Sequence, residues 1–128
     1  MSLAQVADAV FTRLAGLAGL PTIYYQNIDY DTPTEEHIRA TVLPANTETR
    51  GLVNQNIERG IINISIFVPQ GVGIIGAAGY AATVLTGFPR NLDLGNQIRI
   101  DVAGYVEAGI VDGGWYQLPI IIPYLQIS

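Results

Sequence analysis

The sequence predicts an α+β fold, a single domain in which a mostly antiparallel β-sheet is packed by two helices. Two segments place apolar residues at the three- and four-residue spacing of a helix, and six have the alternation or the residue types of a strand. They follow one another as helix, three strands, helix and three strands. Because residues 1–128 contain no linker, internal repeat or low-complexity tract, we expect one domain over the whole length.

The first helix is predicted over residues 3–18. Ser2 and Gln5 have the spacing of a capping box, and Gly19 with Pro21 ends the segment. Its apolar stripe recurs at helical spacing and consists of Leu3, Val6, Val10, Leu14 and Leu17.

Three strands should follow, at residues 22–26, 37–43 and 57–68. The first is rich in strand formers, and the second alternates between apolar and polar residues, with Ile38, Ala40 and Val42 on its apolar face. The third alternates over a length that suits a central strand, with one face made of Ile62, Ile64, Ile66 and Val68. Polar loops are expected at residues 27–36 and 46–56, and the second of these is long for a hairpin connection.

The second helix, over residues 74–88, is apolar nearly all round. Its stripe consists of Ile74, Ala78, Ala81, Leu85 and Phe88, with Tyr80 and Val84 on an adjacent face. A helix without a charged face should pack on the sheet and also against a second surface. A membrane span over residues 72–88 is a competing interpretation, which the short length and four glycines of the segment disfavour.

The last three strands are predicted at residues 98–102, 105–111 and from Trp115 onward, with Asp112-Gly113-Gly114 as a tight hairpin turn. The final strand is apolar on both faces. Its two prolines, Pro119 and Pro123, are four residues apart and therefore lack their N–H groups toward the same side. We expect this strand to lie at an edge of the sheet and to be covered by another subunit.

Composition excludes several classes of function. The chain has no cysteine, and its six basic residues, all arginine, stand against eleven acidic ones for a formal net charge of −5. Phosphate-mediated binding of nucleic acid is therefore disfavoured. With 49% hydrophobic and 13% charged residues, the chain has little polar surface for a monomer of this size, which favours an oligomer.

No catalytic residue, cofactor or metal is expected. His37 is the only histidine and stands beside Glu35 and Glu36, but no second histidine or cysteine is available to complete a zinc site. An acidic cluster of Asp29, Asp31, Glu35 and Glu36 lacks the glycine and the further ligand of a calcium loop, so a solvated loop is the preferred interpretation.

Several short segments occur in a recognisable order. His37 to Ala45 precedes a polar loop, and Arg59-Gly60-Ile61 opens a strand that closes with Pro69-Gln70-Gly71-Val72-Gly73. Asp112-Gly113-Gly114-Trp115-Tyr116 then leads to Pro119 and Tyr124. In this order, over nearly the whole chain, the segments resemble the small tail-terminator-like proteins of long-tailed, siphovirus-type bacteriophages. Members of that family usually carry charges along the second helix, which this chain lacks.

The resemblance implies a virion structural protein with no enzymatic activity. Members form a ring, expected to be a hexamer, that docks on the last ring of the tail tube, ends its polymerisation and joins the tail to the head-completion and neck proteins. The implied partners are further copies of the chain, the major tail tube protein and the head-completion (stopper) protein. Membrane and sequence-specific nucleic acid are not expected partners, although DNA would pass through the ring. The implied location is the tail or neck of the virion, and the host cytoplasm during assembly.

Interface residues are expected in the loop at residues 46–56, in the second helix and in the last strand. They are Leu52, Val53, Tyr80, Val84, Trp115, Pro119, Ile121 and Pro123. Six copies would carry a charge of −30, which predicts an acidic lumen. Alternative functions are another neck or tail-completion component, a small ligand-binding or enzymatic α+β domain, and a membrane-active protein.

Overall fold

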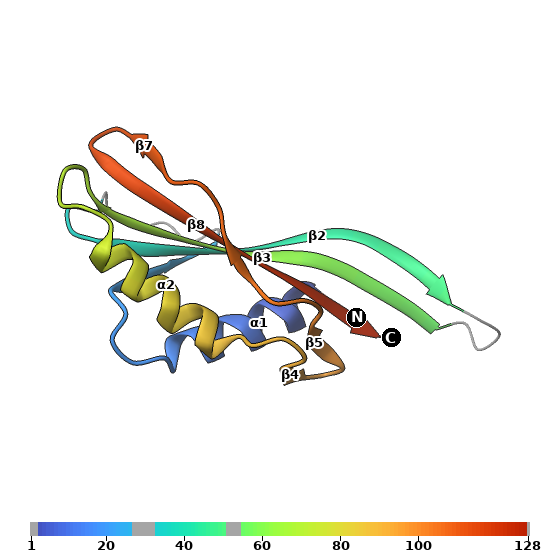
Figure 1. Ribbon diagram of the computed structural model, residues 1–128. Helices are drawn as coiled ribbons and strands as arrows, with labels where there is room; N and C mark the ends of the chain where they lie inside the picture. The colour runs from blue at the N-terminus through green and yellow to red at the C-terminus, as the bar shows by residue number, and fades with distance from the viewer. Residues whose placement is uncertain (1–2, 27–32, 51–54, 128) are drawn as a thin grey trace.

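The computed structural model describes residues 3–26, 33–50 and 55–127 (Figure 1). Two helices, α1 (Leu3–Ala15) and α2 (Ile75–Gly87), lie on one face of a single curled sheet. The strands are β1 (Thr22–Tyr25), β2 (His37–Arg50), β3 (Gln55–Pro69), β4 (Asp93–Gly95), β5 (Ile98–Ile100), β6 (Tyr105–Val106), β7 (Ile110–Asp112) and β8 (Trp115–Ile127). The predicted α+β class is confirmed.

The order of the strands across the sheet is β1-β2-β3-β8-β5-β4, and β6 and β7 also pair with β8. The pair of β1 with β2 is parallel, and the other described pairs are antiparallel, as the sequence predicts for most of the sheet. Long strands β2, β3 and β8 form its centre. The short strands lie at its two margins.

The core lies between the helices and the inner face of the sheet. The predicted inward faces of the second and third strands are buried there. Ile38, Ala40 and Val42 are at most 1% exposed, and the four residues of the third strand, Ile62, Ile64, Ile66 and Val68, are at most 2% exposed. Helix α1 contributes Val6, Val10 and Leu14 from its predicted stripe, although it ends at Ala15 rather than at residue 18. Each fully buried aliphatic side chain contributes about 1.5–3 kcal/mol of transfer free energy.

Helix α2 faces the sheet with a stripe that differs from the predicted one. Ala77, Ala81, Val84 and Phe88 are buried, whereas Ile74 is 58% exposed and Ala78 is also exposed. The predicted stripe is thus right at Ala81 and Phe88 and wrong at Ile74 and Ala78. Because nearly every residue of this helix is apolar, its sequence pattern contains no polar face to fix the rotation.

Strand β8 is an interior strand, so the prediction of an edge strand is wrong. It pairs with β3 over residues 115–127 on one side and with β7, β6 and β5 in turn on the other. The carbonyl groups of Pro119 and Pro123 accept hydrogen bonds from the N–H groups of Glu107 and Asp101, at 2.9 and 3.0 Å. The backbone nitrogens of the two prolines, which carry no hydrogen, therefore face the three short strands.

The two prolines coincide with the two interruptions of that side. The segments of β8 paired there are residues 115–117, 120–121 and 124–126, and Pro119 and Pro123 fall in the gaps between them. A proline cannot donate to a neighbouring strand, which explains why a continuous partner is replaced by three short strands. The predicted strand at residues 105–111 is accordingly split into β6 and β7, and β4 was not predicted.

The predicted polar loop at residues 46–56 is mostly strand. Strand β2 continues to Arg50 and β3 begins at Gln55, and these ends pair with each other from Asn46 with Arg59 to Arg50 with Gln55. Residues 43–50 and 55–60, which we call the arm, form the far end of the hairpin of β2 and β3. Residues 57–60 still pair with β8, and residues 49–50 and 55–56 extend past its end (Figure 1). Long-range pairing between the two segments has overridden their polar composition.

Candidate assembly surfaces

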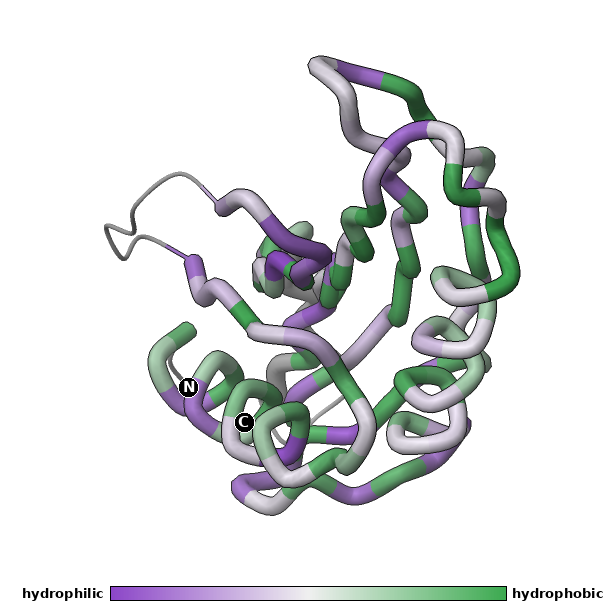
Figure 2. Tube along the Cα trace, turned by 90° about the vertical axis from the view of Figure 1, so that its left-hand side faces the viewer, coloured by the Kyte–Doolittle hydropathy of each residue, from purple (hydrophilic) through white to green (hydrophobic). Residues whose placement is uncertain are grey.

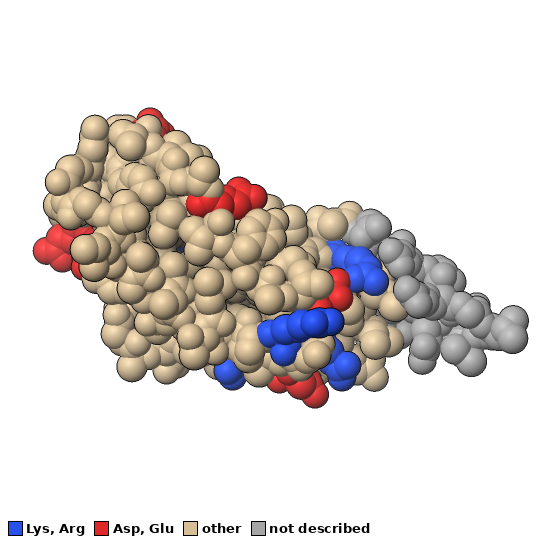
Figure 3. Space-filling view, in the orientation of Figure 1, with Lys and Arg blue, Asp and Glu red and all other residues tan. Residues whose placement is uncertain are grey.

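Apart from Leu3 and Leu43, the exposed large apolar side chains of the described residues gather in two separate places. One set precedes and opens α2 and consists of Val72, Ile74 and Ile75. The other, which we call the apolar strip, runs from the end of β5 to β7 and consists of Val102, Tyr105, Val106, Ile110 and Val111, each 41–58% exposed. In the space-filling view the surface around α2 and β7 is mostly uncharged (Figure 3).

The apolar strip is exposed on both faces of its strands. All three residues of β7 and both residues of β6 are exposed, so neither the helices nor a second layer covers them. The sequence predicts only a strand over residues 105–111 and does not indicate an exposed surface there. Its signal was weak, because the apolar pairs Tyr105-Val106 and Ile110-Val111 occupy consecutive positions and show no alternation.

The outer surface of α2 is made of small residues. Gly76, Ala78, Gly79 and Ala82 are exposed, while Val84 is 0% exposed within its own chain. Tyr80 is half-buried, and its hydroxyl donates to a carboxylate oxygen of Glu36. That hydrogen bond, with smaller contributions from burial and from the charge of Glu36, raises the pKa of Tyr80. Among the described residues, no helix is long and apolar enough to cross a membrane.

The outer face of the sheet carries a hollow of about 530 Å³. Its lining is mixed, because Arg39, Thr41, Asn63, Ser65 and Gln117 surround the rings of Phe67 and Trp115, with Asp112 and Gly113 at one end. The amide Nε2 of Gln117 donates to Ser65 Oγ at 3.1 Å, and Ser65 Oγ donates to Asn63 Oδ1 at 3.2 Å. Asn63, Ser65 and Gln117 are therefore linked by hydrogen bonds across β3 and β8.

His37 lies beside this hollow in an aromatic cluster. Its ring stacks on Phe67 at 4.6 Å between centroids and meets Trp115 and Tyr24 edge-on at 4.9 and 5.5 Å. His37 Nδ1 lies 2.9 Å from the carbonyl oxygen of Glu35, so the protonated Nδ1 donates to it. Burial lowers the pKa of His37 below 6.5, which favours the neutral ring. The surroundings are those of a packed structural histidine.

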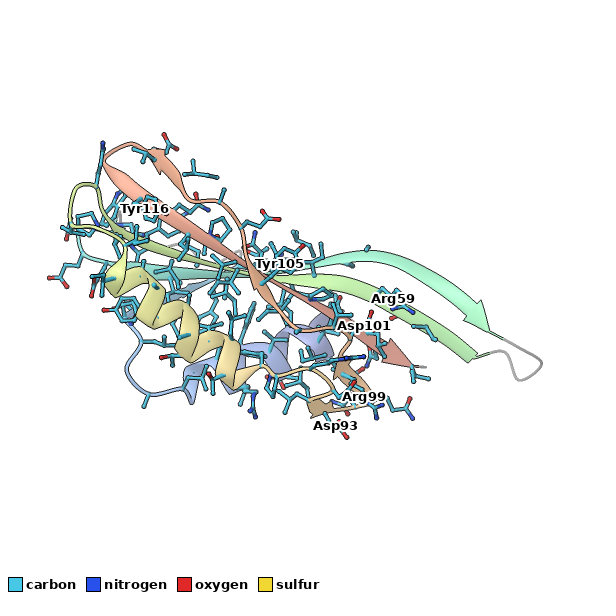
Figure 4. All side chains as sticks on the ribbon, in the orientation of Figure 1. Arg59, Asp93, Arg99, Asp101, Tyr105 and Tyr116 are labelled. Carbon is cyan, nitrogen blue, oxygen red and sulfur yellow. The ribbon has the colours of Figure 1, made fainter. Side chains whose placement is uncertain are left out.

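Charged residues cluster where the arm leaves the body of the sheet. Arg59 and Asp101 form an ion pair at 2.5 Å, and Figure 4 shows Arg59 and Asp101 together, with Arg99 and Asp93 below them on β5 and β4. Each partner of the pair is 30% exposed, so its contribution to stability is small, about 1 kcal/mol or less. Among the described residues no group of three His, Asp or Glu side chains is placed to hold a metal ion.

The remaining predicted interface residues lie in different environments. Pro119 and Ile121 are buried in the interior strand β8, and Pro123 and Trp115 are half-buried. Leu52 and Val53 lie outside the described residues, as do Asp29 and Asp31 of the acidic loop. Whether the eight residues contact a partner stays a prediction. The described parts of the predicted loop, residues 46–50 and 55–56, belong to the arm and form strand rather than loop.

Comparisons with known proteins identify the family. The model of the phage tail terminator protein family matches residues 5–124. Among solved structures, 17 chains match. One of these has a TM-score of 0.75 and 26% identity over 98% of this chain and 95% of its own. A search of the curated proteins gives no match.

A family model that spans nearly the whole chain accounts for the order of segments noted in the sequence. It places the protein among structural components of phage tails, and the family implies a location in the tail of the virion. The small charged fraction of the chain and the two exposed apolar regions suit a component that other proteins cover. The chain belongs to the phage tail terminator family.

Proposed function

We propose that this protein is the subunit of a ring, expected to be a hexamer, that binds the last ring of the tail tube. There it ends polymerisation of the tube and joins the tail to the head-completion proteins. The observation that supports the proposal most directly is the position of the exposed apolar residues. The apolar strip and the Val72–Ile75 segment lie on different parts of the chain. A ring that also binds a tube needs one surface for the neighbouring subunits and another for the partner proteins, and two separate apolar regions can serve these two purposes.

The proposed role needs contacts rather than chemistry. The hydrogen-bonded hollow and the packed His37 offer structural explanations for the polar groups that could otherwise suggest a reaction. We therefore propose that the protein is not an enzyme and needs no cofactor. Its partners would be further copies of itself, the major tail tube protein and the head-completion protein.

DNA is proposed to pass through the ring without being held. A hexamer of chains with net charge −5 carries −30, and a lumen with that sign would repel phosphate groups. A ring structure whose channel is lined by Arg50, Arg59 and Arg90 would contradict this part of the proposal. Assembly would take place in the host cytoplasm, before the tail joins the head.

The first test is the mass of the purified protein by light scattering, over a concentration series at two salt concentrations. We expect one discrete closed oligomer, with six copies. Added to polymerising tail tube protein, the oligomer should bind tube ends and limit tube length. Normal tube growth in the presence of the oligomer would instead favour another neck or tail-completion component. A monomer at all concentrations that does not bind tubes would contradict the proposal.

A further inference from the structure

Strand β2 has a free outer margin along the arm. On that side, β1 pairs only with His37 to Ala40 of β2, and the next outward N–H, that of Val42, donates to the side-chain oxygen of Gln26 at 2.9 Å. The backbone nitrogen of Pro44, two residues further along β2, also points outward but has no hydrogen to donate. Beyond it, residues 46–50 have no described strand on this side. Their outward backbone groups are available to another strand.

The opposite margin of the same sheet is also free at β6 and β7. Both strands pair with β8 on one side, and no described strand pairs with them on the other. Tyr105, Val106, Ile110 and Val111 are exposed along this margin. The free margins at β1 and β4 are less suitable partners, because they expose no large apolar side chain. Their exposed residues are Thr22, Asp93 and Gly95.

The two margins differ in charge. The arm contains Arg50 and Arg59 against Glu48 and Glu58, a net charge of zero, and Arg59 is paired with Asp101 of its own chain. Residues 101–127, which include the apolar strip and β8, contain Asp101, Glu107 and Asp112 and no basic residue. Because the arm has no net charge, electrostatic repulsion would not oppose its approach to the acidic strip of another copy.

Strand direction agrees with such a contact. Strand β2 is antiparallel to β3, β3 to β8, and β8 to β6 and β7, so β2 runs opposite to β6 and β7. Copies related by rotation about an axis along the strands would therefore meet as antiparallel partners. The arm lies at one end of the sheet and the strip toward the other (Figure 1), so the strands must be inclined to the axis, as they are in closed barrels.

From these observations we infer that the outer margin of β2 over residues 46–50 pairs with the β6–β7 margin of a second copy of this chain. The contact joins the sheets of neighbouring subunits and covers the apolar strip. This inference rests on the proposed ring and names the surfaces through which it closes. It assigns the arm to the contact between subunits.

Cysteine cross-linking tests the contact directly, because the natural chain has no cysteine. The test variant combines Thr47→Cys on the arm with Val106→Cys on the strip and is treated with a short bis-maleimide. We expect covalent oligomers that increase by one subunit at a time up to the ring number. The matched control combines Thr47→Cys with Thr86→Cys, which is exposed on α2, and should remain uncross-linked, as should each single variant.

The outcomes separate the inference from the proposed ring. Light scattering of each variant shows whether the oligomer is retained. An intact oligomer in which Thr47→Cys links equally well to both second positions, or to neither, would overturn the inference and leave the ring standing. The absence of both oligomer and cross-links would overturn the inference together with the ring. A second pair, Thr47→Cys with Val111→Cys, protects the test against a mismatch of register along the strip.

Discussion

Gly60 lies in β3 where the side chain of its cross-strand partner Tyr124 crosses the backbone. A Cβ atom added at this position would come within 2.5 Å of the Tyr124 hydroxyl and 2.6 Å of the Leu43 carbonyl oxygen. Tyr124 is 1% exposed, so it has little space into which to move. The identity of residue 60 is thus set by a side chain from a strand that is distant in the sequence.

We expect Gly60→Ala to lower the free energy of unfolding by about 1–3 kcal/mol, because it overpacks the core. The matched control is Gly76→Ala, in the first turns of α2, where an added Cβ meets nothing within 4 Å. This change should raise stability by about 0.5–1 kcal/mol through helix propensity. Urea unfolding of both variants provides the measurement, and equal effects at the two positions would contradict the explanation.

His37 should make stability depend on pH near neutrality. Its pKa is lowered in the folded protein, chiefly by burial, so the unfolded chain takes up the proton first as the pH falls below 6.5. The stability contributed by the neutral ring is complete above 6.5 and is lost as the pH falls toward the lowered folded pKa. The slope should not exceed about 1.4 kcal/mol per pH unit.

Denaturant unfolding between pH 7.5 and 5 measures this slope in the natural chain and in the variant His37→Phe. The variant keeps an aromatic ring beside Phe67 and Trp115 and removes the only histidine, so the slope should decrease. Carboxyl groups titrate in both proteins and do not affect the comparison. Identical slopes would show that His37 does not titrate differently on folding.

At the scale of the elements, the arm is an extension of a hairpin whose base is part of the core. Val42 and Ile62 pair with each other at this base and are both 0% exposed. The hydropathy trace in Figure 2 shows the polar character of the arm beside the apolar body of the sheet. A segment of this composition has little apolar surface to bury within its own chain. Its extended shape therefore fits a contact with a second copy.

Shortening the arm separates folding from assembly. Thr47 and Glu58 are register partners, so residues 48–57 are replaced by Asn-Gly, which favours a two-residue hairpin turn. We expect the same unfolding midpoint within about 1 kcal/mol, since the deleted residues lie beyond the core, and a monomer in light scattering. A shortened chain that still forms the full oligomer would exclude the arm as a subunit contact.

The two helices and the strands differ in how far sequence predicts them. In α1, β2 and β3 the alternation of apolar with polar residues defined one inward face, and burial confirms those faces. In α2 the same method misassigned Ile74 and Ala78, because an apolar helix offers no contrast between faces. The candidate surfaces were predicted still less well, since Val102 and Ile110 become a surface only through the absence of a covering layer.

At the scale of the whole molecule, one face of the sheet is covered by helices and the strip stands clear of them (Figure 1). Exposed apolar side chains favour association, and each that is buried in a contact contributes through the area it removes from water. The low content of charge, 13% of residues, leaves few groups that would oppose such a contact. The composition of the chain therefore favours association.

Charges placed on the strip should disperse the oligomer without unfolding the subunit. Val106 and Val111 are 41% and 58% exposed, so the double variant V106D/V111D should leave the unfolding midpoint nearly unchanged. Two buried carboxylates per contact should weaken association by at least tenfold. The control I75D places one charge at a more exposed residue on α2 and should keep the oligomer. Light scattering measures the mass of both variants. An unchanged oligomer mass for V106D/V111D would contradict the assignment of the apolar strip to the contact between subunits.

The sequence by itself determined the α+β class, the inward faces of α1, β2 and β3, and the turn at Asp112-Gly113-Gly114. These features depend on residues near one another in the chain, where periodicity and backbone preference act. Only the tertiary structure decided that β8 lies inside the sheet. Pro119 and Pro123 cannot donate a backbone hydrogen bond toward one side of the strand. That side could lie at the edge of the sheet, or it could face several short strands with gaps at the prolines, and the sequence does not distinguish the two. The predicted turn brings β7 beside β8, whereas the pairing of β5 and β6 with β8 is specified by no local pattern.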